Sequence, residues 1–306
     1  SARESTASSR LSHAVTVSVW RCELWWEGLF SMLNWVLGFL EAEAAGGAPS
    51  LHGTPPTHCL VDWTDDRLCL HSSFEASAPK NAWLSLFEQP PPVSATSTTA
   101  MDDATLAAAH AAGTVRVSVR YGAPAFDKLG GLLGADPGVD AAARDPSNRM
   151  PAGRIDVATA QRGRKAVARW IRVQPAIGTR ADQLVESTLA SLPLHAWLAV
   201  HIRRSDKLVQ CPQNALSVSV LGRQILAFCA AMSCGGVFLC SCDAGLKREL
   251  ASYLKGQGLQ CAALEDATLP TDARLPPHMD AAIDARQNAK DCLVEVLIMA
   301  RCKALL

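Results

Sequence analysis

The stretch Ala196-Trp-Leu-Ala-Val-His-Ile-Arg-Arg-Ser-Asp-Lys207 decides the fold and holds the densest chemistry of the chain. An apolar run of strand length ends in His201, and Arg203, Arg204 and Lys207 follow directly. Parallel sheets place their functional loops at the carboxyl ends of their strands. Arginine fits phosphate oxygens because its guanidinium is a planar fork of donors that keeps its charge. The stretch therefore predicts a site for an anionic, phosphorylated ligand, and a solvated basic turn is the alternative.

The region around this stretch alternates between strand and helix patterns. We expect strands at 196–202, 237–242 and 259–264, and helices at 218–232, 244–255 and 280–302. Gly235 and Gly236 are expected to stop the first of these helices, and Asp243 to cap the second. Such alternation predicts a parallel sheet with right-handed crossovers. This is a Rossmann-like nucleotide domain without the Gly-x-Gly-x-x-Gly fingerprint, which argues against a dinucleotide redox cofactor.

The first half of the chain is less regular. We expect a helix within 24–40 that follows Gly28, with Ser31 as a possible cap, strands at 59–63 and 115–121, and a basic helix at 155–171. Residues 90–113 have a loop composition, and 122–153 have that of an insertion or poorly ordered loop. We place two α/β domains at 13–185 and 186–306, with the irregular segment near 90–153 in the first.

Composition excludes several function classes. The chain has 306 residues and 29 basic against 29 acidic side chains, so no global field favours nucleic acid or a membrane. The basic helix at 155–171 lacks an aromatic platform, which favours a solvated face over a nucleic-acid surface. Residues 24–40 are too short and too interrupted for a membrane span. The chain starts without Met and ends on an apolar Ala-Leu-Leu, which we interpret as a fragment.

Eleven cysteines is an odd number, so at least one is unpaired in a monomer. A zinc site built from Cys234, Cys240, Cys242 and Cys261 would lack any Cys-x-x-Cys knuckle, and ordinary buried thiols are the favoured interpretation. We expect no metal and no other cofactor.

The run His201-Ile-Arg-Arg-Ser-Asp-Lys207 resembles the His-x-Arg-Arg-x-Asp-Lys motif of α1,6-fucosyltransferases, which act on N-glycans or bacterial chitin oligosaccharides. Shorter His-x-Arg versions occur in protein O-fucosyltransferases. The resemblance implies a GT-B-like α/β fold with two Rossmann-like domains, and fucose transfer from GDP-fucose by inversion without a metal. It also implies that Arg204 binds the donor diphosphate, with His201, Arg203 and Asp206 beside it and Lys207 among the catalytic cations.

Further site residues are implied by the same resemblance. Asp243 is matched to an aspartate that contacts the guanosine and ribose end of the donor, and Glu295 to an aspartate of the last helix that we place among the catalytic residues. Gly28 and Asn34 match a glycine-rich loop and helix near the donor in the first domain. Cys242 replaces the first member of the family's aspartate pair.

The chain also departs from the family at the position of the catalytic base. Glycosyl transfer needs charge stabilisation on the departing diphosphate and a base for the acceptor hydroxyl. Gln210-Cys211 stands where the resembling enzymes carry a glutamate. The predicted function is fucose transfer to a glycan or glycoprotein, with no nucleic-acid or membrane partner and a Golgi or secretory setting if eukaryotic. The alternatives are a protein O-fucosyltransferase-like enzyme and a non-catalytic nucleotide- or glycan-binding relative.

Overall fold

The computed structural model describes residues 15–22, 29–44, 56–63, 81–93, 103–120, 157–204, 215–264 and 283–306. Their contacts divide the chain into two units. Unit 1 comprises Ser1–Thr64 and Glu88–Arg172, and unit 2 comprises Asp65–Phe87 and Val173–Leu306. Each unit is built around a parallel β-sheet.

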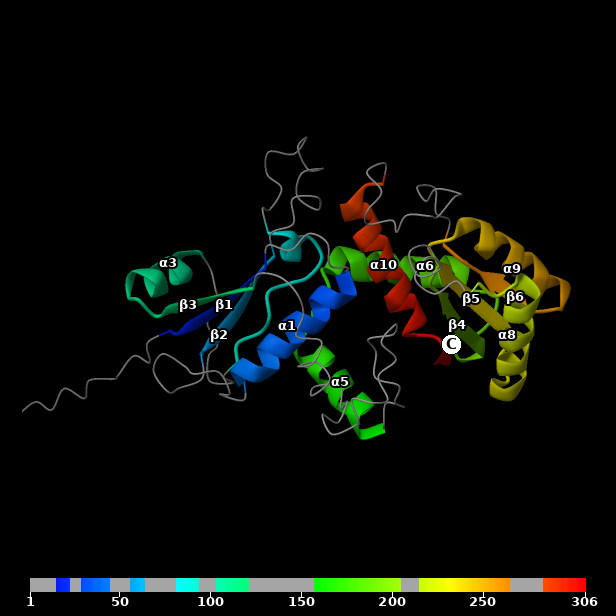
Figure 1. The fold of residues 1–306 in the computed structure, drawn as a ribbon, viewed down its shortest axis with the longest axis horizontal. Helices are drawn as coiled ribbons and strands as arrows, with labels where there is room; N and C mark the ends of the chain where they lie inside the picture. The colour runs from blue at the N-terminus through cyan, green and yellow to red at the C-terminus, as the bar shows by residue number, and fades with distance from the viewer. Residues whose placement is uncertain are drawn as a thin grey trace, which may run out of the picture. The chain divides into compact units, whose positions relative to one another are not determined.

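Unit 1 contains a parallel sheet in the order β2-β1-β3, with β1 in the centre (Figure 1). Its strands are β1 (Val17–Cys22), β2 (His58–Trp63) and β3 (Val115–Arg120). Its helices are α1 (Leu29–Ala44), α3 (Asp103–Ala111) and α5 (Val157–Trp170).

The helices of unit 1 pack on its sheet through side chains that alternate between the two faces of the strands. Val17, Val19 and Leu60 pack with Ala109, which places α3 on that face of the sheet. Helix α1 contacts β1 and β2, and α5 packs against α1. The indole Nε1 of Trp170 on α5 donates to the carboxylate of Glu41 on α1.

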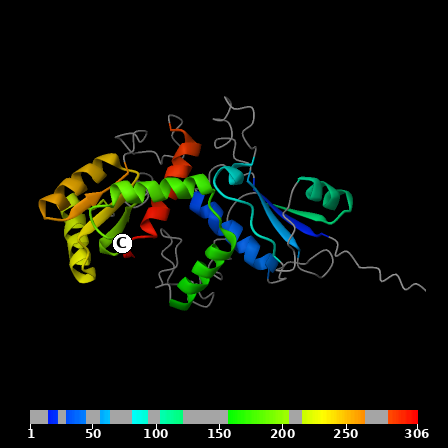
Figure 2. The same cartoon turned by 180° about the vertical axis from the view of Figure 1, so that it is seen from behind.

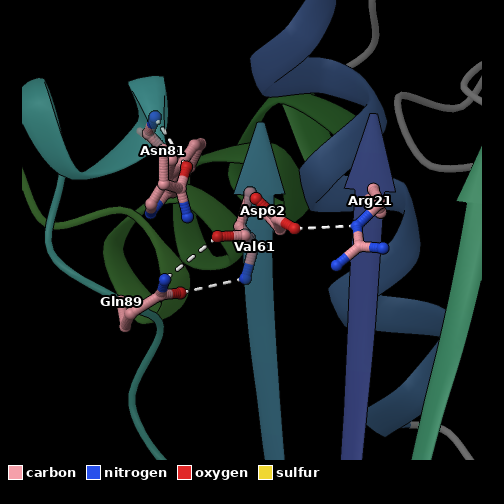
Figure 3. A network of polar contacts seen from close by, with 6 residues as sticks. Arg21, Val61, Asp62, Asn81 and Gln89 are labelled. Carbon is pink, nitrogen blue, oxygen red and sulfur yellow. Dashed lines mark hydrogen bonds and ion pairs between the residues drawn. The ribbon is translucent and has the colours of Figure 1, made fainter. Parts of the chain in front are cut away.

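The edge strand β2 is closed by a side chain. The Gln89 carboxamide accepts from Val61 N at 2.9 Å and donates to Val61 O at 3.0 Å, so it occupies the place of a neighbouring strand (Figure 3). At the next position, Arg21 and Asp62 are register partners on β1 and β2, and Arg21 Nε donates to Asp62 Oδ2 at 2.8 Å. Paired edges resist pairing with another chain.

Unit 2 contains a parallel sheet in the order β6-β5-β4-β7. Its strands are β4 (Trp197–Ile202), β5 (Gly236–Ser241), β6 (Gln260–Ala262) and β7 (Ala304–Leu305). Its α-helices are α6 (Pro175–Thr188), α8 (Val218–Met232), α9 (Ala244–Gly256) and α10 (Ala285–Met299). Short 3₁₀ helices in the described part of the unit are η1 (Ala82–Ser85) and η3 (Leu194–Ala196).

The sheet of unit 2 lies between two helical layers (Figures 1 and 2). Buried residues of β4 and β5 pack with α8 and α9 in one core, formed by Leu198, Val200, Val237, Leu239, Ile225, Cys229, Leu250 and Leu254. The intervening Cys240 of β5 interacts electrostatically with Cys292 and Glu295 of α10, so α10 covers the other face. Helix α6 packs against α10, where Arg180 Nη1 pairs with Asp291 Oδ1 at 2.7 Å.

The strand order fixes a topological switch point in unit 2. From β4, the crossovers through α8 and α9 move outward to β5 and β6, whereas α10 returns the chain to β7 on the opposite side of β4. Open α/β sheets bind ligands outside the carboxyl ends of their strands at such a point. The residues that follow β4 therefore occupy the position where a ligand is expected.

The end of α8 corrects one prediction. The helix stops at Met232 because Ser233 adopts the left-handed conformation at φ 52°, and Gly235 and Gly236 are not its caps. Gly236 instead begins β5, where a Cβ would lie 2.6 Å from the Trp197 ring. The glycine is required by this close approach of backbone to an indole.

Other boundaries also differ from the sequence interpretation. Residues 103–111, expected to be loop, form α3, because alanine has a high helix propensity that outweighs the surrounding Ser, Thr and Pro. Ser31 lies inside α1 rather than capping it. Helix α10 begins at Ala285, not 280, since the Asp284 carboxylate accepts from Arg286 N and Gln287 N.

The predicted α/β class with two Rossmann-like, parallel-sheet units is confirmed by the strand pairing. The insertion expected at 122–153 lies outside the described residues. Within the part of the chain that the structure describes, no helix is both long and apolar enough to cross a membrane.

Candidate functional site

The arginine pair lies at the switch point of unit 2. Arg203 and Arg204 follow β4, whose neighbour β7 is held by His201 N donating to Leu306 O at 3.0 Å. Arg203 is exposed, whereas Arg204 is half-buried. The imidazole pKa of His201 is lowered, first by loss of hydration and then by the positive charge of Arg203. The end of β4 is therefore a cationic site near neutral pH without a contribution from histidine.

Arg204 is held from two sides. Its Nη2 donates to Leu216 O at 2.7 Å, and its Nη1 lies 3.7 Å from Asp243 Oδ2. The side chains of Arg204 and Asp243 are 20% and 19% exposed. A separation of 3.7 Å is an ion pair but not a direct hydrogen bond. Asp243 thus orients the guanidinium loosely, and the two residues that the motif placed after adjacent strands do meet.

Asp243 also has the structural role that its position predicted. Its Oδ1 accepts from Leu246 N at 2.8 Å and caps α9, while its own N–H donates to Ser241 Oγ at 3.2 Å. One carboxylate oxygen therefore serves the helix and the other faces Arg204. A substitution of Asp243 that cannot cap a helix would therefore disturb both the start of α9 and the contact with Arg204.

Lys247, one helical turn after Asp243, and Glu295 on α10 are two charged residues that influence each other, and only one of them was identified from the sequence. Glu295 on α10 was singled out, but its electrostatic partner Lys247 on α9 was not. Lys247 is 6% exposed, and its Nζ donates to Leu264 O at 3.3 Å. The sequence could have indicated this buried lysine, because Lys247 lies between Leu246 and Leu250 in the apolar stripe of α9. All three side chains are buried.

Burial shifts both members of this couple toward their neutral forms. Desolvation raises the pKa of Glu295 to about 7, and Asp291 adds to the rise while Lys247 opposes it. Desolvation lowers the pKa of Lys247, and Glu295 opposes that change. Burial also raises the pKa of the Cys240 thiol, which interacts with both Glu295 and Lys247. Perturbed groups of this kind gather at functional sites, although structural ion pairs show the same shifts.

The remaining predicted site residues belong to undescribed segments or to unit 1. Gly28, Asp206 and Lys207 lie outside the described residues, as do Gln210 and Cys211. Asn34 lies on α1 in unit 1, and its side chain is not described. The described site thus consists of Arg203, Arg204 and Asp243 above the couple of Lys247 and Glu295.

This arrangement suits an anionic ligand. It combines two arginines at the carboxyl edge of a parallel sheet with a carboxylate positioned for hydroxyl or amino groups. In the described residues, no cluster of three or more His, Cys, Asp or Glu side chains could hold a metal ion. Trp83 and Phe87 are both buried, with ring centroids 4.4 Å apart, so their role is packing.

No protein-family model matches the chain. No curated protein sequence matches it either.

Solved structures of fucosyltransferases are similar to the chain over most of its length. NodZ from Bradyrhizobium is 16% identical with a TM-score of 0.42, over 95% of this chain and 87% of NodZ. POFUT1 in complex with GDP is 13% identical with a TM-score of 0.40, over 95% and 90%. POFUT1 in complex with GDP-fucose is 12% identical with a TM-score of 0.42, over 96% and 90%. At these identities and TM-scores the likeness assigns no activity, donor or acceptor to this chain.

Proposed function

We propose that the chain is a fucosyltransferase-like glycosyltransferase that moves fucose from GDP-fucose to a glycan hydroxyl, with inversion and without a metal, in the manner of α1,6-fucosyltransferases. The observation that carries the proposal is the placement of Arg204 beside Asp243 at the switch point of a nucleotide-type sheet. Arg204 belongs to the motif that resembles the family and Asp243 was matched to a donor-contacting aspartate, and their separation of 3.7 Å supports the proposal.

The proposed chemistry follows from the charges present. As the bond between fucose and the diphosphate breaks, negative charge develops on the leaving diphosphate, and Arg203 and Arg204 stabilise it by charge-assisted hydrogen bonds. Asp243 Oδ2 accepts from the guanosine or ribose end of the donor. Lys207 adds a further cation, and Asp206 orients the neighbouring arginine. A base must take the proton of the acceptor hydroxyl, and no residue is assigned to that step.

A second candidate function is a relative that binds the nucleotide or a glycan without turnover. Two sequence features favour it: Cys242 replaces a carboxylate that the resembling enzymes direct at the donor, and Gln210-Cys211 replaces their glutamate. Under this alternative the arginine site still binds GDP, but no acceptor is modified.

The first test is calorimetric titration of GDP and GDP-fucose in EDTA. We expect both ligands to bind the wild-type chain, and Arg204→Ala to weaken GDP binding by about 2 kcal/mol, since hydrogen bonds to charged groups contribute on that scale. Arg223→Ala is the matched control, because Arg223 is an exposed arginine on α8 of the same unit. Absence of GDP binding to the wild-type chain would overturn the donor assignment.

Acceptor assays then separate the α1,6-type enzyme, a protein O-fucosyltransferase-like enzyme and the non-catalytic relative. Transfer of fucose to a free glycan supports the α1,6-type enzyme, whereas strict use of a folded protein acceptor would favour protein O-fucosylation. GDP binding without turnover on either class of acceptor would identify the non-catalytic relative.

A further inference from the structure

Lys247 is an unusual residue for its location. It is 6% exposed, and with Glu43 of unit 1 it is one of two Lys, Arg, Asp or Glu residues buried to this degree among the described positions. A buried ammonium is costly unless it is paired and hydrogen-bonded. Leucine or methionine would fill the same helical stripe without that cost, so the charge itself requires an explanation.

The partners of Lys247 come from three different elements. Its Nζ donates to Leu264 O, just after β6, at 3.3 Å. It interacts electrostatically with Glu295 on α10 and with Cys240 on β5, and Cys240 interacts with Glu295 as well. Lys247 is therefore bonded to the segment that follows β6, and its charge also acts on Glu295 of α10.

The same lysine belongs to the first turn of α9, which presents Asp243 to Arg204. Its backbone N–H donates to Asp243 O at 3.0 Å, and the preceding Leu246 N–H donates to Asp243 Oδ1. The carboxylate that faces Arg204 is therefore one helical turn from the buried ammonium. Displacement of this turn would move Asp243 relative to the end of β4.

We infer that Lys247 and Glu295 are positioning residues for the donor site: Lys247, buried and bonded to Leu264 O, anchors the first turn of α9 to the segment after β6, the charge of Glu295 on α10 stabilises the ammonium there, and Asp243 is so fixed beside Arg204. This inference rests on the proposed donor function. It assigns Glu295 an indirect role, through Lys247 and Asp243, in place of direct contact with the reacting atoms. Such an anchor keeps the Asp243 carboxylate close to its binding position, and a preorganised site tolerates only small displacements of its binding groups.

The test compares GDP affinity with thermal stability at pH 8, where Glu295 is ionised. We expect Lys247→Met and Glu295→Gln each to weaken GDP binding about tenfold, measured by calorimetry well below the melting temperature. The double variant should be no weaker than the worse single variant, because both changes remove one shared anchor. Lys255→Met and Glu249→Gln are matched controls from exposed positions of the same helix, and they should bind GDP as the wild type does.

The readouts distinguish positioning from simple support of the fold. A purely structural role would lower the melting temperature and leave the affinity of the folded protein within twofold of wild type, which would overturn the inference. If Lys247→Met fails to fold, the double variant Lys247→Met/Glu295→Gln decides, since it leaves no unpaired buried charge. Wild-type affinity in that variant overturns the inference, and a tenfold loss supports it. Failure of the wild type itself to bind GDP overturns the donor function instead.

Discussion

Each sheet carries an arginine–aspartate pair across two adjacent strands, and the two pairs differ in how firmly the sheet holds them. In unit 1, Arg21 and Asp62 lie within β1 and β2 as register partners, 2.8 Å apart, with side chains 42% and 28% exposed (Figure 3). In unit 2, Arg204 and Asp243 lie beyond β4 and β5, 3.7 Å apart, and are about 20% exposed.

The difference teaches how position along a strand decides what a charged pair can do. Within the strands, ladder hydrogen bonds fix the separation, so Arg21 and Asp62 act as a cross-strand contact. Beyond the strand ends, the side chains depend on other supports: Leu216 O holds Arg204, and the cap of α9 holds Asp243. Arg204 and Asp243, the pair with the longer separation, lie at the switch point of the sheet, where open α/β sheets bind ligands. We therefore expect ligand binding from the second pair and a small stability contribution from the first.

The largest expected effect concerns the support beneath the second pair. The pKa of Glu295 rises from 4.5 to about 7 on folding, so the folded state binds one proton more than the unfolded state between these values. Stability must then fall as pH rises through this window. The loss is about 3 kcal/mol, since one pKa unit corresponds to about 1.4 kcal/mol.

Glu295→Gln removes the pH dependence of stability that the titration of Glu295 contributes, because glutamine resembles the protonated acid at every pH. Urea unfolding at pH 4.5, 6 and 8 should show the variant gaining stability relative to wild type by about 3 kcal/mol across the series. Both proteins keep Lys247 and Asp291, the charged residues that act on Glu295. A pH-independent difference would show that Glu295 titrates normally.

The next effect compares the two arginines directly. Arg204 uses Nη1 and Nη2 for different partners, and a lysine ammonium cannot reproduce that fork. We expect Arg204→Lys to weaken GDP binding by about 1.5 kcal/mol although the charge is kept. Arg21→Lys should leave the affinity unchanged. Equal losses in both variants would show that the chain responds to arginine replacement in general, and the distinction between the pairs would be lost.

Much of unit 2 was predictable from sequence because its signals are local and agree with one another. Apolar runs mark β4 and β5, and Asp243 marks the start of α9 as its cap. The meeting of Arg204 with Asp243 followed from the rule that adjacent parallel strands end at one edge. No contact had to be known in advance.

Other features depend on tertiary contacts that no local pattern reveals. Gly236 looked like a helix stop but is fixed by the Trp197 ring, and α8 ends at Ser233 in a conformation that serine rarely adopts. Lys247 was not singled out from the sequence, because the apolar stripe of α9 gives no sign of the Leu264 carbonyl that accepts its hydrogen bond. The carbonyl of Leu216, a partner of Arg204, leaves no trace in sequence because every residue carries one.

The smallest expected effect is that of the tight pair in unit 1. A half-exposed ion pair contributes about 0.5 kcal/mol, because solvent screens the charges and ordering the side chains costs entropy. A double-mutant cycle with Arg21→Gln and Asp62→Asn, measured by urea unfolding at low and high salt, should give a coupling of about that size that falls as salt rises. The bracing of Val61 by Gln89 is retained in every variant, so the edge of β2 stays closed. A coupling above about 2 kcal/mol that is insensitive to salt would mean that this pair is held as rigidly as a buried one. The contrast between the two sheets would then lie in ligand access and not in exposure to solvent.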